Sequence, residues 1–209
     1  MRYLFVIFFL ISSISTSFAQ QNRSKLKEGD LVFQDLDCGP LCDAIEAVTN
    51  GYQGRDFSHV AILVKMNKEL RAVEAIGSHV KSTSLDSLFL RCPDPKKYLI
   101  MRLTKENQYR IPLACKYAKT TIGKAYDDRF IYDNDSLYCS ELIYNAFLNT
   151  SNTENLFYLQ PMTYKDPKTG TYFPAWIEYY QGLHSFIPEG LQGINPGLLS
   201  RSPYLEPVE

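Results

Sequence analysis

Short apolar runs separated by turn residues dominate the first half of the chain. Residues 58–65 (SHVAILVK) are β-branched and apolar, which is typical of a buried strand. Similar runs predict further strands at 30–34, 71–76 and 98–103. Asn67 and Lys68 predict a tight turn that joins two of these strands into a hairpin.

Other segments, mostly later in the chain, have apolar residues at helical spacing. Helices are predicted at 40–49, 113–122 and 137–149. The first begins with Pro40, which is tolerated in the first turn of a helix, and the third has Asp135 or Ser136 as its N-cap. Strands followed by helices indicate the α+β class, with a mostly antiparallel sheet packed on helices.

The segment from about 150 to 209 shows little periodicity and is rich in Gly, Pro and Tyr. Its aromatic residues are too numerous for a disordered linker: Phe157, Tyr158, Phe173, Trp176, Tyr179 and Tyr180. We expect a long ordered tail that wraps the domain and contributes a wall of a cleft.

The N-terminus has the pattern of a secretory signal. Arg2 precedes an unbroken apolar run, Tyr3–Ile11, and small residues precede a cleavage point between Ala19 and Gln20. The run is too short to span a bilayer, which makes an N-terminal membrane anchor the weaker alternative. We therefore predict a signal peptide over 1–19 and one domain over 20–209. The protein would be exported, periplasmic or extracellular, without stable membrane insertion after cleavage.

Composition and charge exclude several functional classes. The 209 residues include 22 Lys and Arg against 23 Asp and Glu, a net charge of −1, so the chain lacks the basic excess of a nucleic-acid-binding protein. With 45% hydrophobic and 22% charged residues, the composition is that of an ordinary globular domain. No glycine-rich phosphate loop, acidic cluster or zinc-binding spacing occurs, so we predict no cofactor and no metal.

An exported chain with five cysteines leaves at least one thiol unpaired. Cys38 and Cys42 are close enough in sequence for a local disulfide, and Cys92 and Cys115 are further candidates for pairing. The alternative is that all five are reduced and mostly buried. The sequence does not choose among these pairings.

Cys139 is a candidate nucleophile because it lies near the start of a predicted helix. Unpaired backbone N–H groups and the helix dipole favour a thiolate there, and a free N–H could hold an oxyanion. Alternatively, Cys139 is a small core residue.

A nucleophilic thiol needs a base, and the chain has three histidines. His59 opens the most apolar strand and is the candidate on rigid structure, whereas His79 follows a turn and is its competitor. Glu74 interrupts the otherwise apolar run 72–76, where a carboxylate is costly without a partner. It either orients His59 across the hairpin or faces water at the edge of the sheet.

Five motifs occur in a diagnostic order: Gly29-Asp30-Leu-Val-Phe, Ser58-His59-Val-Ala-Ile, Val73-Glu74-Ala75, Gly123-Lys-Ala-Tyr126-Asp127 and Tyr138-Cys139-Ser140-Glu141-Leu142. This order resembles the YiiX-like branch of the NlpC-type, papain-like cysteine hydrolases over residues 30–148. The resemblance implies a circularly permuted papain-like fold, in which the histidine and a third polar residue precede the nucleophile.

The resemblance also implies a role for each matching residue. Cys139 matches the nucleophile, His59 the base and Glu74 the third polar position, which varies among relatives. Tyr126 matches a tyrosine ahead of the nucleophile and is expected to contact substrate or the oxyanion, the alternative being a packed aromatic residue. The cysteine-containing turn at 37–42 is not a recognised feature of the family.

These observations support an exported cysteine hydrolase that forms a thioester acyl-enzyme and cleaves amide bonds, with cell-wall peptides (peptidoglycan fragments) as the expected substrates. One alternative is a lipid-directed thioesterase or acyltransferase. An apolar groove near Cys139 would indicate the lipid-directed enzyme, and a polar groove a cell-wall peptidase. Two further alternatives are a non-catalytic binding module on the same fold and a structural protein in which Cys139 forms a disulfide.

Overall fold

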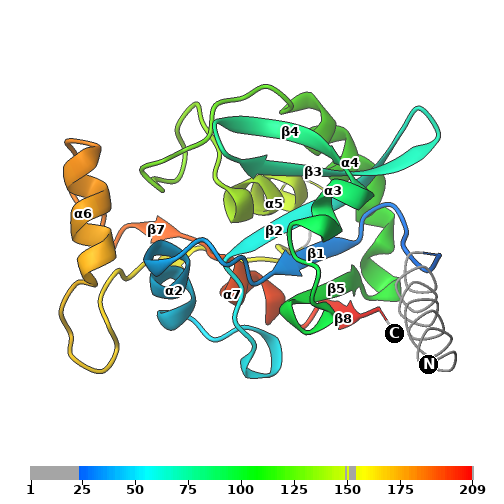
Figure 1. Ribbon diagram of the computed structural model, residues 1–209. Helices are drawn as coiled ribbons and strands as arrows, with labels where there is room; N and C mark the ends of the chain where they lie inside the picture. The colour runs from blue at the N-terminus through cyan, green and yellow to red at the C-terminus, as the bar shows by residue number, and fades with distance from the viewer. Residues whose placement is uncertain (1–23, 149, 151–153, 209) are drawn as a thin grey trace, which may run out of the picture.

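The computed structural model describes residues 24–148, 150 and 154–208 (Figure 1). The predicted signal peptide, residues 1–19, lies outside these described residues. Across the described ranges, no helix combines the length and apolar character needed to cross a membrane.

A six-stranded antiparallel sheet forms the centre of the molecule, in the order β4-β3-β2-β1-β5-β8 (Figure 1). The strands are β1 (Leu31–Gln34), β2 (His59–Met66), β3 (Glu69–Ile76), β4 (His79–Ser84), β5 (Tyr98–Leu103) and β8 (Leu205–Pro207). The sheet and the helices packed on it confirm the predicted α+β class. The four predicted strands are present, while β4 and β8 were not predicted.

β2 is buried along most of its length because both faces of the sheet are covered. Within residues 60–64, alternate side chains enter two different cores. One core includes side chains of helices α4 (Ile111–Thr120) and α5 (Cys139–Leu148), and the other includes side chains of α3 (Leu85–Leu90). A strand covered on both sides needs a continuous apolar run, which is the pattern that the sequence shows.

Short helices and a small two-stranded sheet complete the described structure. The helices are α2 (Pro40–Ala47), α6 (Pro174–Gly182) and α7 (Pro196–Ser200), with 3-10 helices at Tyr52–Gly54, Pro95–Lys97 and Lys105–Arg110. The small sheet pairs β6 (Gln160–Pro161) with β7 (Gln192–Gly193). The helix predicted at 40–49 corresponds to α2, and the one predicted at 113–122 corresponds to α4, which begins two residues earlier.

The prediction that a helix begins near residue 137 with Asp135 or Ser136 as N-cap is wrong, because α5 begins at Cys139. The N–H of Leu137 donates to the carbonyl of Ala125 (3.0 Å), which holds this segment as a bridge to the preceding loop. Backbone pairing with a distant segment thus overrides the local helical pattern. Cys139 is consequently the first residue of the helix rather than a position inside it.

The tail contains more regular structure than its weak periodicity predicts. It forms α6, α7, β6, β7 and β8. Both α6 and α7 begin with proline, whose fixed backbone angle suits the first turn of a helix. With five residues, α7 is too short to establish a detectable period. Figure 1 shows the tail running out to α6 beside α2 and returning through β7 to the edge of the main sheet.

Candidate active site

The hairpin of β2 and β3 brings Glu74 next to His59 at the start of β2. His59 Nε2 lies 2.7 Å from Glu74 Oε2, and both side chains are buried. Because β3 lies between β2 and β4, Glu74 is not on an edge strand. The structure therefore shows the partnered carboxylate and not the water-facing alternative.

Cys139 completes the arrangement from the start of α5. Its side chain forms a hydrogen bond with His59 and is not part of a disulfide. Since His59 Nε2 faces Glu74, Nδ1 is the ring nitrogen that remains for the thiol. The structure thus brings together the three residues that the sequence singled out, and the alternative of a disulfide at Cys139 is wrong.

Charge is distributed asymmetrically across this triad. Burial alone would lower the pKa of His59, but hydrogen bonds to Cys139 and Glu74 outweigh burial and raise it to about 9. Burial would raise the pKa of Glu74, but His59 and Arg91 outweigh it and hold that pKa at about 2. At neutral pH the imidazole therefore carries a proton beside an ionised carboxylate.

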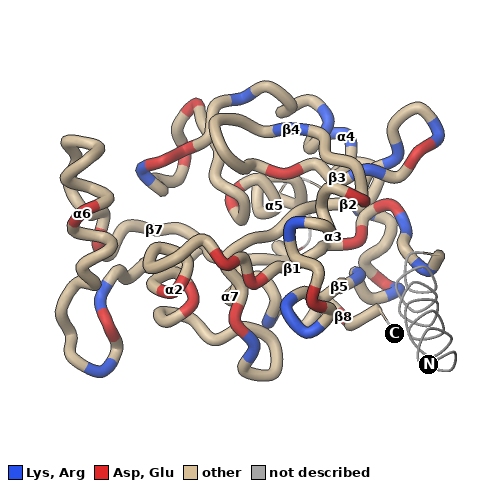
Figure 2. The backbone as a smooth tube through the Cα atoms, viewed as in Figure 1, with Lys and Arg blue, Asp and Glu red and all other residues tan. Residues whose placement is uncertain are grey.

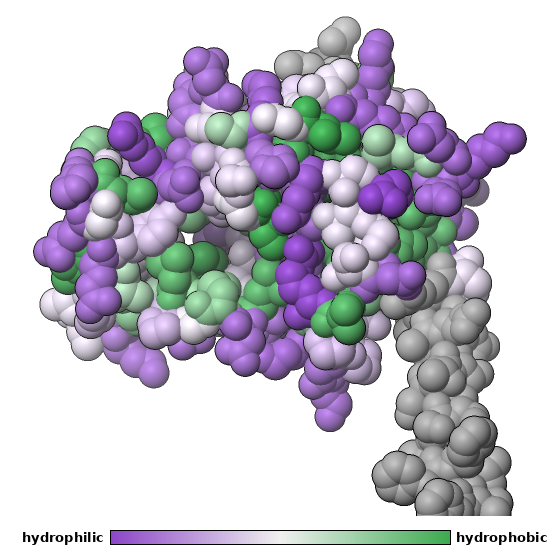
Figure 3. Space-filling model, turned by 45° about the horizontal axis from the view of Figure 1, so that its top comes forward, coloured by the Kyte–Doolittle hydropathy of each residue, from purple (hydrophilic) through white to green (hydrophobic). Residues whose placement is uncertain are grey.

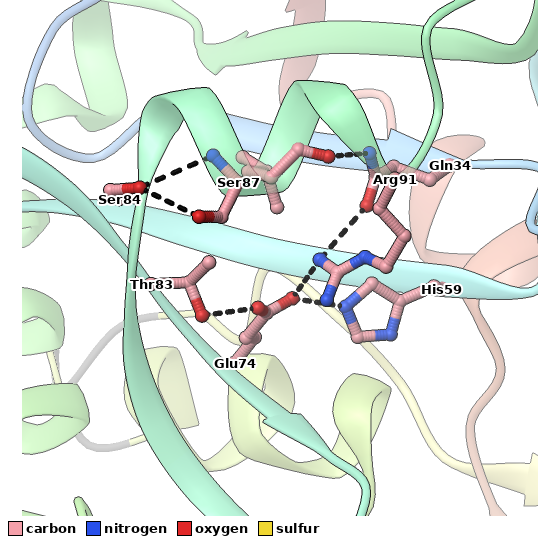
Figure 4. A network of polar contacts seen from close by, with 8 residues as sticks. Gln34, His59, Glu74, Thr83, Ser84, Ser87 and Arg91 are labelled. Atoms are coloured by element: carbon pink, nitrogen blue, oxygen red, sulfur yellow. Dashed lines mark hydrogen bonds and ion pairs between the residues drawn. The ribbon is translucent and has the colours of Figure 1, made fainter.

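Two further side chains hold the Glu74 carboxylate, and the sequence analysis did not identify either (Figure 4). Arg91, just after α3, places Nη2 2.6 Å from Glu74 Oε2. Thr83 on β4 donates its hydroxyl to Glu74 Oε1 at 2.6 Å. Arg91 also lies 3.4 Å from the side-chain oxygen of Gln34. The only available signal was indirect, namely that a buried carboxylate requires several donors.

The start of α5 is fixed by contacts on both sides of the nucleophile. The Glu141 carboxylate accepts a hydrogen bond from the backbone N–H of Asp133 (3.3 Å), in the loop before the helix. Ser140 Oγ donates to the carbonyl of Ile194 (2.8 Å), and the N–H of Ile194 donates to the Tyr138 hydroxyl (3.2 Å). The helix end that presents Cys139 is therefore tied to the tail.

Tyr126 lies next to the nucleophile. Burial, followed by the proximity of Cys139, raises its pKa well above the ordinary value, so its hydroxyl stays protonated and able to donate. The competing base, His79, is exposed at the start of β4, and its Nδ1 lies 2.8 Å from the Ser78 hydroxyl. Of the two histidines, the structure places His59 at Cys139.

A pocket of about 460 Å³, including its open mouth, lies beside Cys139. It is lined by Ile45, Val48, Ser58, Tyr126, Phe130, Tyr138, Cys139, Ser140, Met162, Thr163, Tyr164, Trp176, Ile194, Asn195 and Pro196. About half of these residues belong to the tail, which therefore forms a wall of the cleft. Figure 3 shows a hollow with hydrophobic residues at its rim on one face of the molecule.

Glu74→Gln should lower the pKa of His59 below about 9, because it removes the carboxylate that stabilises the imidazolium. The pKa is measured by NMR titration of the histidine ring protons. Glu69→Gln, an exposed change on the same strand, should leave it unaltered. An unchanged His59 pKa in Glu74→Gln would show that the carboxylate does not support the imidazole.

Arg91→Met should lower the unfolding free energy by about 3 kcal/mol, because it leaves a buried carboxylate short of a partner. Glu74 has a depressed pKa, so the stability it provides is full above its unfolded pKa of about 4.5 and is lost as pH falls toward 2. The cost of the substitution should shrink over the same range in denaturant titrations.

Lys97→Met is the matched control, since the ion pair of Lys97 with Asp35 is partly exposed and its loss should cost much less than that of Arg91. An equal cost of Arg91→Met at pH 7 and at pH 3 would contradict the role assigned to Arg91.

The chain matches one family model over residues 25–209, described as the permuted papain-like amidase enzyme, YaeF/YiiX, C92 family. It is 32% identical over 125 residues to the uncharacterized protein YiiX of Escherichia coli (strain K12), a match that covers 58% of this chain and 57% of that relative. The crystal structure of the metalloprotein yiiX from Escherichia coli O157:H7 has a TM-score of 0.69 and 25% identity, covering 88% of this chain and 97% of the other.

The match to the curated relative therefore spans a little over half of that protein's length. The family model, in contrast, covers nearly all of the described structure. The antiparallel sheet, the late position of the nucleophile candidate and this match agree: the chain belongs to the permuted papain-like amidase family of YaeF and YiiX, a family of papain-like cysteine hydrolases.

Proposed function

We propose that this chain hydrolyses an amide bond through a thioester formed on Cys139. The observation that carries the proposal is the buried contact chain from Glu74 through His59 to Cys139. Such a chain provides a nucleophile, a proton carrier and a group that orients the carrier. The amidase description of the family supports the choice of reaction.

In the acylation step, Cys139 Sγ attacks the carbonyl carbon as a thiolate, paired with the His59 imidazolium that already holds the proton. The negative charge then lies on the former carbonyl oxygen. The backbone N–H of Cys139, at the first position of a helix, and the hydroxyl of Tyr126 are the proposed donors to that oxygen. The C–N bond breaks as His59 gives its proton to the departing amine, which leaves an acyl thioester on Cys139.

In the deacylation step, His59 takes a proton from water and the resulting hydroxide attacks the thioester carbon. The C–S bond breaks, a carboxylic acid leaves, and the Cys139 thiolate again lies beside protonated His59. Glu74 stays ionised throughout, because Arg91 and Thr83 hold both of its oxygens. Its role is to fix the orientation and the tautomer of the imidazole.

The related crystal structure is described as that of a metalloprotein. Within residues 24–148, 150 and 154–208, no group of three or more His, Cys, Asp or Glu side chains lies close enough to hold a metal ion. The described residues do not fit such a centre, and the proposed steps use only side chains and backbone groups of this chain.

We also propose that the protein works outside the cytoplasm. The N-terminal pattern of residues 1–19 supports export, and so does a disulfide between Cys38 and Cys42. Disulfides persist mainly in oxidising compartments. The disulfide closes the turn before α2, whose last turn and following residue line the pocket.

The hydrolase proposal is tested by alkylation with iodoacetamide at pH 6–7, with the modified residue located by peptide mass. Cys139 should react before Cys92 and Cys115, since burial raises the pKa of both of those thiols, that of Cys115 to about 12. His59→Ala should slow the reaction of Cys139 at least tenfold, and His79→Ala should not.

For an amide that the protein hydrolyses, kcat/KM should fall as pH rises through about 9, because His59 then loses the proton that the leaving amine needs. A non-catalytic binding module would be indicated instead if Cys139 of the His59→Ala variant is labelled at the wild-type rate and if Cys139→Ala keeps full activity in the cell.

Export is tested by recovering the protein from the periplasm or the medium and measuring the mass of its N-terminal peptide. The expected peptide begins at Gln20, after removal of residues 1–19. Full-length protein confined to the cytoplasm, with Cys38 and Cys42 reduced, would contradict the proposed location.

A further inference from the structure

The pocket beside Cys139 identifies the class of group that binds next to the reacting bond. Cys139 itself lines the pocket, so a substrate attached at the thiol extends into it. Its walls come from α2, from the loop before α5 and from the tail. What these walls present to a ligand therefore restricts the substrate of the proposed hydrolase.

The lining contains no Lys, Arg, Asp or Glu. Figure 2 shows the same absence along β7 and the chain that leads to α7, residues 191–200. Apolar and aromatic side chains provide most of the surface: Ile45, Val48, Phe130, Met162, Trp176 and Ile194. A charged group placed among them would lose its hydration without gaining a counter-charge.

Most polar side chains of the lining are already used within the protein; the exceptions include Tyr126, proposed to face the oxyanion, and Tyr164, whose hydroxyl has no partner among the described residues. Ser140 donates to a backbone carbonyl, and Thr163 donates to the carboxylate of Glu189. Ser58 accepts from the N–H of Leu36. They hold the walls together and do not offer a set of donors and acceptors to a polar substrate.

Asn195 is occupied in the same way, since its side chain bonds Thr49 and caps α7. The indole N–H of Trp176 is buried and has no acceptor among the described residues. It could accommodate one neutral oxygen on a ligand but provides no counter-charge.

The wall is also fixed in shape. The Phe130 ring packs edge-on against Tyr126, Tyr138 and Trp176, with centroid distances of 5.6–6.2 Å. A Cβ atom at Gly193 would lie 2.7 Å from Met162 Cγ, so any other residue there would require the Met162 side chain to shift. Rings and backbone in such contact form a preformed cavity.

One carboxyl group lies behind this wall. Glu46 on α2 bonds Ser58, and burial raises its pKa to about 7, with Asp35 and Asp56 adding to the shift. These acidic neighbours disfavour an anionic ligand further. The carboxylates of cell-wall stem peptides would therefore meet an apolar surface with acidic groups behind it.

From the uncharged lining, its occupied polar groups and its place at Cys139, we propose that the pocket binds an uncharged aliphatic acyl group, so that the chain removes fatty-acyl-type groups from amides. This inference rests on the proposed hydrolase function and specifies its substrate class. It favours the lipid-directed alternative over cell-wall peptides.

The test uses 4-nitrophenyl esters of acetate, butyrate and hexanoate with the mature wild-type protein, and Cys139→Ala as the blank. The value of kcat/KM should rise about fourfold for each added methylene, the factor that corresponds to about 0.8 kcal/mol per buried CH₂. The half-ester of glutarate, whose chain ends in a carboxylate, should react at least tenfold more slowly than butyrate.

A variant with a cation in the wall should reverse this preference. Val48→Arg should raise kcat/KM for the glutarate ester and lower it for hexanoate, with Ile45→Lys as a second variant if the first does not fold. Leu113→Arg, at an exposed position on α4, should change neither value.

The outcomes separate the two proposals. The acyl pocket is overturned if Cys139-dependent hydrolysis has the same kcat/KM at every chain length, or if it is faster with the glutarate ester or with a charged stem peptide. Either result leaves the hydrolase proposal in place. Both proposals are overturned if no ester shows Cys139-dependent release of nitrophenol and if His59→Ala does not change the rate at which Cys139 is labelled.

Discussion

The structure of the site depends on one buried negative charge. Glu74 has no access to water, and an ionised carboxylate in such a place is stable only when several donors surround it. His59, Arg91 and Thr83 are those donors. Each comes from a different element, so forming the network aligns β2, β3, β4 and the end of α3 (Figure 4). The requirement to neutralise Glu74 thus fixes the imidazole that faces the nucleophile.

Cys139, the proposed nucleophile, is held from the opposite direction. α5 packs against β2 and β3, and its first turn is tied to the tail through Ser140, Tyr138 and Ile194. The same part of the tail lines the pocket beside Cys139. The sheet therefore holds the charged groups of the proposed mechanism, while the tail contributes part of the apolar surface beside Cys139. Substitutions in the tail should change substrate preference before they change the chemistry.

Much of this arrangement could be predicted from the sequence because its signals are local. The apolar run of β2 and the carboxylate within an apolar strand identified His59 and Glu74, and the ordered motifs identified Cys139. Contacts between distant segments left no such signal. Arg91 lies in a stretch without periodicity, and α5 starts at Cys139 because residue 137 pairs with the preceding loop. The tail helix α7 was missed because its five residues do not establish a period.

The central claim is that Glu74 acts on the reaction only through His59, and a double-mutant cycle tests it most directly. The rate of Cys139 acylation is measured in wild type, Glu74→Gln, His59→Ala and the double variant. If the two side chains work as a unit, Glu74→Gln slows wild type but has no further effect once His59 is absent. Additive losses in the double variant would contradict the account and would show that Glu74 acts on Cys139 or the substrate by a separate route.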